Sequence, residues 1–116
     1  MENRLIQVRQ KLKDNNIDAI LITKRQNYMY LSGFTGTSAH LLISAEKAYL
    51  ITDFRYIEQA TRQAPLFEVV KYQGNIEIEI KKLLEELFVK KLGFEADHLT
   101  YDKYLCYKEK FENTEL

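Results

Sequence analysis

AHLLISAEKAYLIT, residues 39–52, consists of two apolar runs separated by the polar tripeptide Ala45-Glu46-Lys47. Both runs are rich in Leu, Ile and Tyr, residue types that favour strands, and the gap between them has the length of a hairpin loop. The stretch therefore predicts a β-hairpin with strands over residues 39–44 and 48–52.

Three other apolar segments predict strands that accompany this hairpin. Residues 17–22 (IDAILI) are almost continuously apolar, which is typical of a strand covered on both faces. Residues 67–72 (FEVVKY) and 92–96 (LGFEA) predict the remaining two strands.

The segments between these strands predict helices. Leu5, Val8 and Leu12 recur at helical spacing with charged residues between them. This first helix is expected to end at residues 14–16, because Asn tolerates a left-handed conformation. Residues 27–31 predict a short helical turn that leads into a glycine loop.

Three later helices are each predicted from a capping residue that precedes an apolar stripe. Asp53 starts the helix that Pro65 ends. Asn75, after the strand-breaking Gly74, starts the second helix, and Thr100 starts the third. The expected inner faces are Ile57, Ala60, Thr61 and Ala64; then Ile76, Ile80, Leu83, Leu84 and Leu87; and finally Tyr101, Tyr104, Leu105 and Lys108. In the second of these helices the charged residues, Glu77 among them, are expected to face water.

The alternation of helices and strands predicts an α/β domain of three layers. Its mixed, largely buried sheet includes the hairpin and is flanked by helices. A chain of 116 residues without internal repeat or linker corresponds to one domain, residues 1–116.

Composition excludes several classes of protein. Apolar residues make up 46% of the chain and charged residues 29%, as in folded soluble domains. Seventeen basic residues balance seventeen acidic ones, so nothing in the net charge attracts nucleic acid or anionic lipid, and neither is expected as a partner. The single Cys106 and the lack of a signal-peptide pattern or long apolar run favour a cytoplasmic protein.

Motifs of catalysis and metal binding are missing from the sequence. It contains no G-x-S-x-G elbow, no H-E-x-x-H and no C-x-x-C. Glu95, Asp97 and His98 cluster after a strand, where α/β sheets place sites, but a capping role before the last helix is favoured over metal ligation. The residues therefore predict neither a catalytic group nor a metal ligand.

The glycine loop of residues 33–38 (GFTGTS) permits three interpretations. The first is a tight turn in which Gly33 and Gly36 adopt positive φ. A phosphate cradle is disfavoured, because a strand rather than a helix follows and the P-loop lysine is missing. The third interpretation is a loop presented to another kind of substrate.

Arg55 is unusual, because a cation is disfavoured in the first turn of a helix. A carboxylate should compensate for it, and the nearby Asp53 is the first candidate. A structural ion pair between Asp53 and Arg55 is favoured over contact of Arg55 with a substrate carboxylate or another subunit.

Three motifs in order resemble the N-terminal domain of the creatinase/prolidase/aminopeptidase P family. NYMYLSGF at residues 27–34 is similar to the family's N-x-x-Y-L-(S/T)-G-F, and TDFRY at residues 52–56 to its T-D-x-R-Y. LGFE at residues 92–95 is similar to its (L/V)-G-F-E. The matches extend over about residues 3–111 and are nearest to the bacterial Xaa-Pro dipeptidase/aminopeptidase branch.

The resemblance implies a small α/β domain with a mixed sheet that precedes a larger catalytic "pita-bread" domain. In the family's Xaa-Pro peptidases the larger domain holds a pair of divalent metals, usually Mn or Co. That domain is absent here, so the chain is expected to be a truncated or excised N-terminal domain with no cofactor of its own. The full-length parent is expected to be a dinuclear-metal hydrolase.

The resemblance also implies roles in dimer assembly and in shaping substrate access to the partner subunit's active site. Expected partners are the chain's own C-terminal catalytic domain, a second subunit and, through the parent, an Xaa-Pro peptide. The implied substrate-facing loop comprises Phe34, Thr35, Gly36, Thr37 and His40. Creatinase has an arginine in this loop where this chain has Thr37, so recognition of creatine is disfavoured.

The sequence also permits a binding function instead of a role within a peptidase. The chain could be a free-standing module that binds a small ligand or a protein through residues 33–38. Turnover of an Xaa-Pro substrate by the polypeptide alone would contradict a non-catalytic domain, and saturable stabilisation by phosphate would support the cradle.

Overall fold

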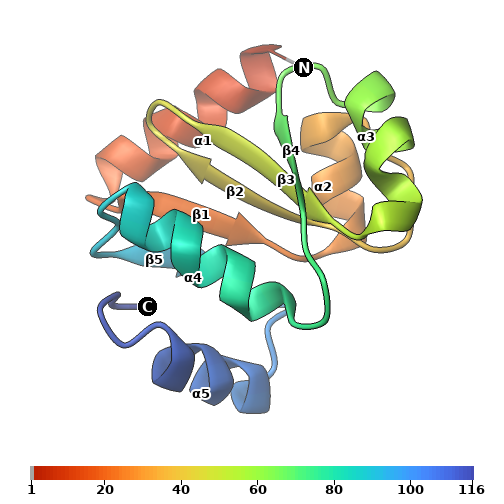
Figure 1. The fold of residues 1–116 in the computed structure, drawn as a ribbon. Helices are drawn as coiled ribbons and strands as arrows, with labels where there is room; N and C mark the ends of the chain where they lie inside the picture. The colour runs from red at the N-terminus through yellow and green to blue at the C-terminus, as the bar shows by residue number, and fades with distance from the viewer. Residues whose placement is uncertain (1) are drawn as a thin grey trace.

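The chain forms one mixed β-sheet with helices on both faces, described for residues 2–116 in a computed structural model (Figure 1). The strands are β1 (Ala19–Ile22), β2 (His40–Ser44), β3 (Ala48–Thr52), β4 (Glu68–Lys71) and β5 (Leu92–Phe94). The helices are α1 (Glu2–Asp14), α2 (Arg25–Ser32), α3 (Ile57–Gln63), α4 (Ile76–Glu86) and α5 (Tyr101–Lys110), with a 3₁₀ turn, η1 (Phe54–Tyr56), before α3. The predicted three-layer α/β fold is confirmed.

The predicted hairpin lies at the centre of the sheet, whose strand order is β4-β3-β2-β1-β5. Strand β2 is antiparallel to both neighbours, and His40 lies opposite Ile51 of β3. Strands β4 and β5 run parallel to β3 and β1. Consequently β1, β3, β4 and β5 all end at the edge where β2 begins, which we call the carboxyl edge.

Each face of the sheet has its own core. Leu41 and Ile43 of β2 pack with residues of α1, α2 and α3, whereas Leu42 packs with residues of α4 and α5. This division follows from the alternation of side chains along a strand. The nearly continuous apolar runs of the central strands are therefore buried on both sides, as predicted.

Most helix boundaries follow the predicted capping residues. Asn16 has a φ of 55° just after α1, Asn75 accepts a hydrogen bond from the Glu77 amide at 2.9 Å, and Thr100 accepts one from the Lys103 amide. Asp53 caps η1 rather than α3 directly. Among residues 2–116, no helix is long and apolar enough to cross a bilayer.

Three predicted helix faces need correction. Thr61 is exposed on α3, and its hydroxyl bonds the Ile57 carbonyl instead of packing inward. Glu77 is only 7% exposed, because it lies between α4 and α5 and pairs with Lys103 at 3.2 Å. In α5 the buried residue is Tyr107, while Tyr101 and Leu105 are exposed.

The segment that follows α5 returns to the sheet beside β5. The Leu92 amide of β5 donates to the Glu115 carbonyl at 2.7 Å, and the Glu115 amide donates to the Lys90 carbonyl at 2.7 Å. These bonds draw the segment against the outer edge of β5, which would otherwise leave backbone groups unpaired. The return of the chain buries Phe111, and its ring stacks on Tyr107 at 5.1 Å.

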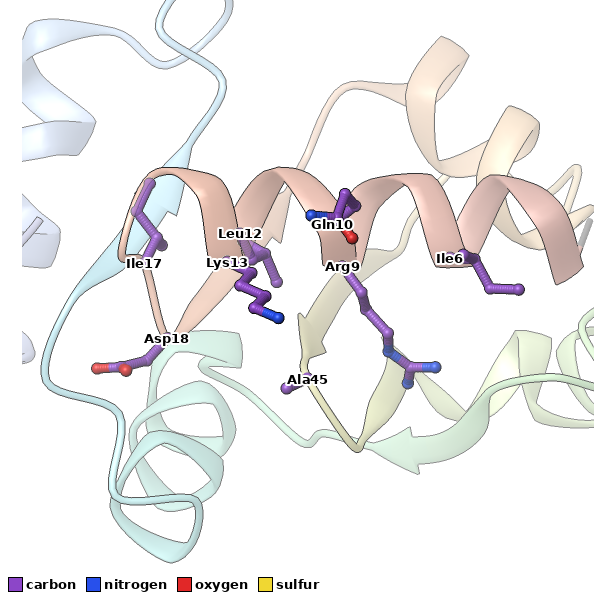
Figure 2. Close-up of a pocket in the computed structure, with 8 residues that line it drawn as sticks. All are labelled: Ile6, Arg9, Gln10, Leu12, Lys13, Ile17, Asp18 and Ala45. Carbon is purple, nitrogen blue, oxygen red and sulfur yellow. The ribbon is translucent and has the colours of Figure 1, made fainter.

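A hollow of about 480 Å³ lies at the edge opposite to the carboxyl edge (Figure 2). It runs along α1, and the side chains of Arg9 and Lys13 extend from the helix toward Ala45 in the hairpin turn. The Arg9 guanidinium donates to the Ser44 carbonyl at 2.9 Å, so it fastens α1 to the hairpin.

Two isoleucines of α4 provide a matched test of the core. Ile80 is 0% exposed and Ile78 is 55% exposed. We expect Ile80→Ala to lower the free energy of unfolding by about 2–5 kcal/mol, since it leaves a cavity. Ile78→Ala should change it by less than about 0.5 kcal/mol. Denaturant titration of both variants measures the difference, and equal losses would contradict the burial assigned to α4.

Candidate functional site

The glycine loop, residues 33–38, joins α2 to β2 at the carboxyl edge and is anchored by one aromatic residue. Phe34 is 0% exposed, and its ring lies 6.1 Å from that of Tyr28 and 5.7 Å from that of Tyr56. In this domain Phe34 therefore supports the loop from beneath and does not reach its surface. The exposed side chains of the loop are those of Thr35 and Thr37.

The two glycines of the loop are required for different reasons. Gly33 has a φ of 88° and ends α2, as predicted. Gly36 does not have the predicted positive φ. It is buried, and a Cβ added at this position would overlap the ring of Phe34. Close packing, rather than backbone conformation, demands glycine there.

Two side chains of α2 hold the backbone carbonyls of the loop. The Arg25 guanidinium donates to the Thr35 carbonyl at 2.7 Å and to the Gly36 carbonyl at 3.3 Å. The Tyr28 hydroxyl donates to the Gly36 carbonyl at 2.6 Å. Burial raises the pKa of Tyr28, and the neighbouring Arg25 opposes this rise, so the hydroxyl stays protonated and able to donate.

The opposite side of the loop is bonded to the segment after β3. The Thr35 amide donates to Gln63 Oε1 of α3 at 2.9 Å, and the Thr37 and Tyr56 hydroxyls lie 2.8 Å apart. The Thr52 hydroxyl at the end of β3 donates to the Ser38 carbonyl at 2.6 Å. The loop is thus fixed from two directions while its threonine side chains remain accessible.

Asp53 and Arg55 lie in contact beside the loop. Arg55 donates through Nη2 to Asp53 Oδ2 at 2.8 Å and through Nε to Oδ1 at 3.0 Å. These hydrogen bonds lower the pKa of the Asp53 carboxyl and raise that of the Arg55 guanidinium. The pairing compensates for a cation at the start of the turn.

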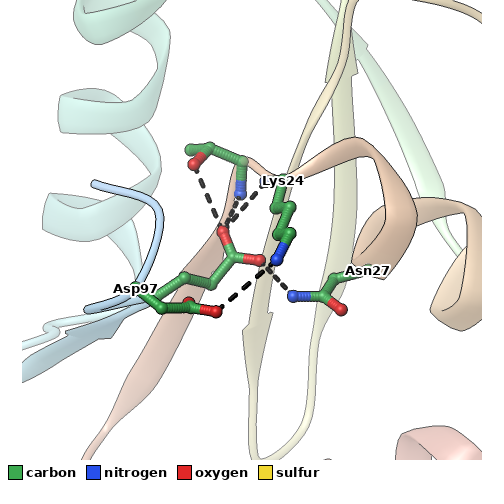
Figure 3. A network of polar contacts seen from close by, with 5 residues as sticks. Lys24, Asn27 and Asp97 are labelled. Atoms are coloured by element: carbon green, nitrogen blue, oxygen red, sulfur yellow. Dashed lines mark hydrogen bonds and ion pairs between the residues drawn. The ribbon is translucent and has the colours of Figure 1, made fainter. Parts of the chain in front are cut away.

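Glu95, the residue after β5, caps α2 from a distant part of the chain. It belongs to the polar network in which Figure 3 labels Lys24, Asn27 and Asp97. Its Oε1 accepts the amides of Thr23 and Lys24 at 2.6 and 2.9 Å, and its Oε2 accepts Asn27 Nδ2 at 2.6 Å. The N-cap Lys24 has no side-chain cap of its own, so Glu95 satisfies its amide and that of Thr23 just before it. The capping role predicted for this cluster therefore falls on α2 rather than on α5.

The three sequence motifs form one continuous scaffold. Glu95 of the last motif bonds Asn27 of the first, whose Tyr28 holds the Gly36 carbonyl. Tyr56 of the middle motif contacts both Phe34 and Thr37. Residues that are widely separated in the sequence thus fix the geometry of residues 33–38.

His40 lies on the other face of the sheet from Phe34. It shares the orientation of Leu42 in β2 and lines a cavity of about 350 Å³ with Lys103 and Tyr107 of α5. The implied substrate-facing set is therefore divided between two faces, because alternation along β2 directs His40 away from the loop. Sequence reasoning missed Arg25, Gln63 and Tyr107, for which no local pattern gives a signal.

The geometry of residues 2–116 gives no support to metal binding. Within residues 2–116, no group of three or more His, Cys, Asp or Glu side chains is arranged to hold a metal ion. Glu95 already bonds two amides and Asn27, while Asp97 pairs with Lys24 at 3.5 Å.

Sequence comparison identifies a family that covers almost the entire chain. Residues 4–116 match the family described as the Creatinase/Prolidase N-terminal domain. The uncharacterized peptidase YqhT of Bacillus subtilis is 40% identical over 100 residues, which are 86% of this chain and 28% of that protein. A putative Xaa-Pro aminopeptidase of Mycoplasma pneumoniae is 34% identical over 94% of this chain and 30% of its own length.

Solved structures give the same result. An Xaa-Pro dipeptidase from Bacillus anthracis superposes with a TM-score of 0.94 at 40% identity, over 99% of this chain and 32% of that one. The N-terminal domain of the cytoplasmic peptidase PepQ from Mycobacterium tuberculosis has a TM-score of 0.88 at 36% identity, over 98% of this chain and 90% of that one. The resemblance found in the three motifs is confirmed. The chain spans about a third of the length of its full-length relatives.

Gly36→Ala tests the close packing beneath the loop. We expect it to lower the free energy of unfolding by about 1–3 kcal/mol, because the new methyl group must displace the Phe34 ring. Gly93→Ala is the control, since its Cβ would meet Ile17 at an ordinary 3.5 Å. Chemical denaturation compares the two, and equal stability of both variants would refute the packing argument.

His40 should make stability depend on pH. Burial lowers its pKa below the ordinary 6.5, with Lys103 acting in the same direction and the Ala39 carbonyl, Glu77 and Glu95 opposing. The unfolded chain therefore binds a proton that the folded chain takes up only at lower pH, so stability declines as pH falls below about 6.5.

His40→Gln should remove this part of the pH dependence. Unfolding curves recorded in steps from neutral to mildly acidic pH measure the effect, and His98→Gln, which replaces an exposed imidazole, serves as the control. Parallel profiles for His40→Gln and the unmodified chain would contradict the prediction.

Proposed function

Because this chain belongs to the Creatinase/Prolidase N-terminal domain family, we propose that it acts as the non-catalytic N-terminal domain of an Xaa-Pro dipeptidase or aminopeptidase. Its relatives include an Xaa-Pro dipeptidase and a putative Xaa-Pro aminopeptidase, of which it covers 32% and 30%. In this proposal the remainder of such a protein carries the hydrolytic chemistry. This domain supports dimer assembly and shapes access of the substrate to the partner subunit's reaction centre.

The observation that carries the proposal is the fixed conformation of residues 33–38. The carbonyls of Thr35, Gly36 and Ser38 are bonded by Arg25, Tyr28 and Thr52. A loop held in this way presents Thr35 and Thr37 without a cost of ordering when a substrate binds. In this proposal the loop lines a site, with the exposed side chains of Thr35 and Thr37 turned toward it.

The proposal also assigns roles to the residues of the loop and to the ion pair beside it. Thr35 and Thr37 face the peptide, Phe34 and Gly36 support them, and Asp53 and Arg55 serve as a structural or subunit-interface pair. The reaction centre would hold two divalent ions, Mn or Co, bound by residues outside this chain. The name of the PepQ relative also supports a cytoplasmic location.

A chimera tests the proposal directly. The matched third of the Bacillus anthracis dipeptidase is replaced by this chain, and hydrolysis of an Xaa-Pro dipeptide is measured. We expect the chimera to be active. Thr37→Val in the chimera should lower kcat/KM about tenfold, because a hydroxyl that contacts the substrate is lost.

Thr61→Val in α3 is the matched control, since Thr61 is also exposed but lies outside the loop. It should leave kcat/KM unchanged. A folded chimera without turnover, or equal activity of the Thr37 and Thr61 variants, would contradict a substrate-facing loop.

The isolated 116-residue polypeptide should release no proline from an Xaa-Pro substrate when manganese is supplied. The reason is that its own side chains provide no set of metal ligands within residues 2–116. Proline release is followed by chromatography. Clear turnover that depends on manganese would overturn the non-catalytic assignment.

A further inference from the structure

The cavity at the carboxyl edge that His40 lines is also lined by the other histidine of the chain, His98. It measures about 350 Å³, a volume suited to a small molecule. Its lining residues are Thr23, His40, His98, Leu99, Thr100, Lys103 and Tyr107. It is formed by β2, α5 and the segments after β1 and β5, on the face of the sheet opposite to Phe34.

Tyr107 has a hydroxyl that the fold leaves unsatisfied. The residue is 1% exposed, and its oxygen has no hydrogen-bond partner within residues 2–116. The ring is accounted for by stacking on Phe111, for which a phenylalanine would serve equally well. A buried hydroxyl without a partner is unfavourable, so a ligand that accepts a hydrogen bond from it would be stabilised there.

The polarity of the cavity favours an anion. Its lining includes Lys103 and two imidazoles but no carboxylate. Two carboxylates lie near the cavity without lining it: Glu95 accepts the Thr23 amide and Asn27, and Glu77 pairs with Lys103 at 3.2 Å. Burial and, after it, Glu77 raise the pKa of Tyr107, so its hydroxyl stays protonated and can donate to an anion. Lys103 has three N–H donors and uses one of them on Glu77, so two remain for a ligand.

The helix α5 adds to this preference. Thr100 is its N-cap and lines the cavity, so the positive end of the helix dipole faces the same space. His40 Nδ1 lies 2.8 Å from the Ala39 carbonyl, so its Nε2 is the ring nitrogen that can face a ligand. The Lys103 ammonium lies 5.8 Å from the centre of the Tyr107 ring, so one small anion could contact both residues.

We propose that this cavity binds a small carboxylate anion, held by the Tyr107 hydroxyl and the Lys103 ammonium at the N-terminal end of α5. The site is distinct from residues 33–38, since the sheet separates His40 from Phe34. The proposal therefore does not depend on the function proposed for the loop. It assigns a binding role to two residues, Lys103 and Tyr107, that the peptidase hypothesis does not use.

Titration of the intact chain with acetate and with lactate tests the site. Nuclear magnetic resonance follows the His40 and His98 ring signals, with sodium chloride as the control for ionic strength. We expect saturable shifts at millimolar concentrations of carboxylate. Non-saturating shifts identical to those in sodium chloride, or tighter binding of inorganic phosphate than of either carboxylate, would overturn the assignment.

Variants identify the groups responsible. Tyr107→Phe keeps the ring and should weaken carboxylate binding at least about tenfold without lowering the thermal midpoint. Lys103→Met should weaken it similarly. Tyr101→Phe and Lys108→Met change exposed residues of the same helix and should bind like the unmodified chain. Equal affinity of the Tyr107 and Tyr101 variants, or of the Lys103 and Lys108 variants, would refute the proposal.

Discussion

The carboxylate of Glu95 joins the end of β5 to the segment that leads into α2 and to α2 itself. It is 9% exposed, accepts the amides of Thr23 and Lys24 just before α2 and fixes the side chain of Asn27. A buried charge without such partners would be strongly destabilising, so the contact favours one position of α2 relative to β5. Since α2 supplies Arg25 and Tyr28, the geometry of residues 33–38 depends on this interaction.

Packing and hydrogen bonding act together in the glycine loop. Phe34 fills the space between α2 and η1, and Gly36 allows the chain to pass directly over its ring. Hydrogen bonds from Arg25 and Tyr28 then fix the carbonyls above. Such a loop is ordered before anything binds, which suits a segment that shapes the entrance to a reaction centre.

The carboxyl edge offers two chemically different surfaces because successive side chains of β2 point to opposite faces of the sheet. Its odd-numbered residues support the side of the loop, while His40 and Leu42 face α4 and α5. The first surface presents neutral hydroxyls, and the second gathers Lys103, two imidazoles and the unpaired hydroxyl of Tyr107. One sheet thus separates a proposed peptide-facing loop from a proposed carboxylate site.

The sequence by itself determined the order of helices and strands, the hairpin, the caps at Asn75 and Thr100, and the family. These features depend on periodicity and local hydrogen bonds, which neighbouring residues specify. Only the tertiary structure decided that Glu95 caps α2, that Gly36 is glycine because of Phe34, and that Glu77 and Tyr107 are buried between α4 and α5. Each of these depends on contact between segments far apart in the chain, and no local pattern records such a contact.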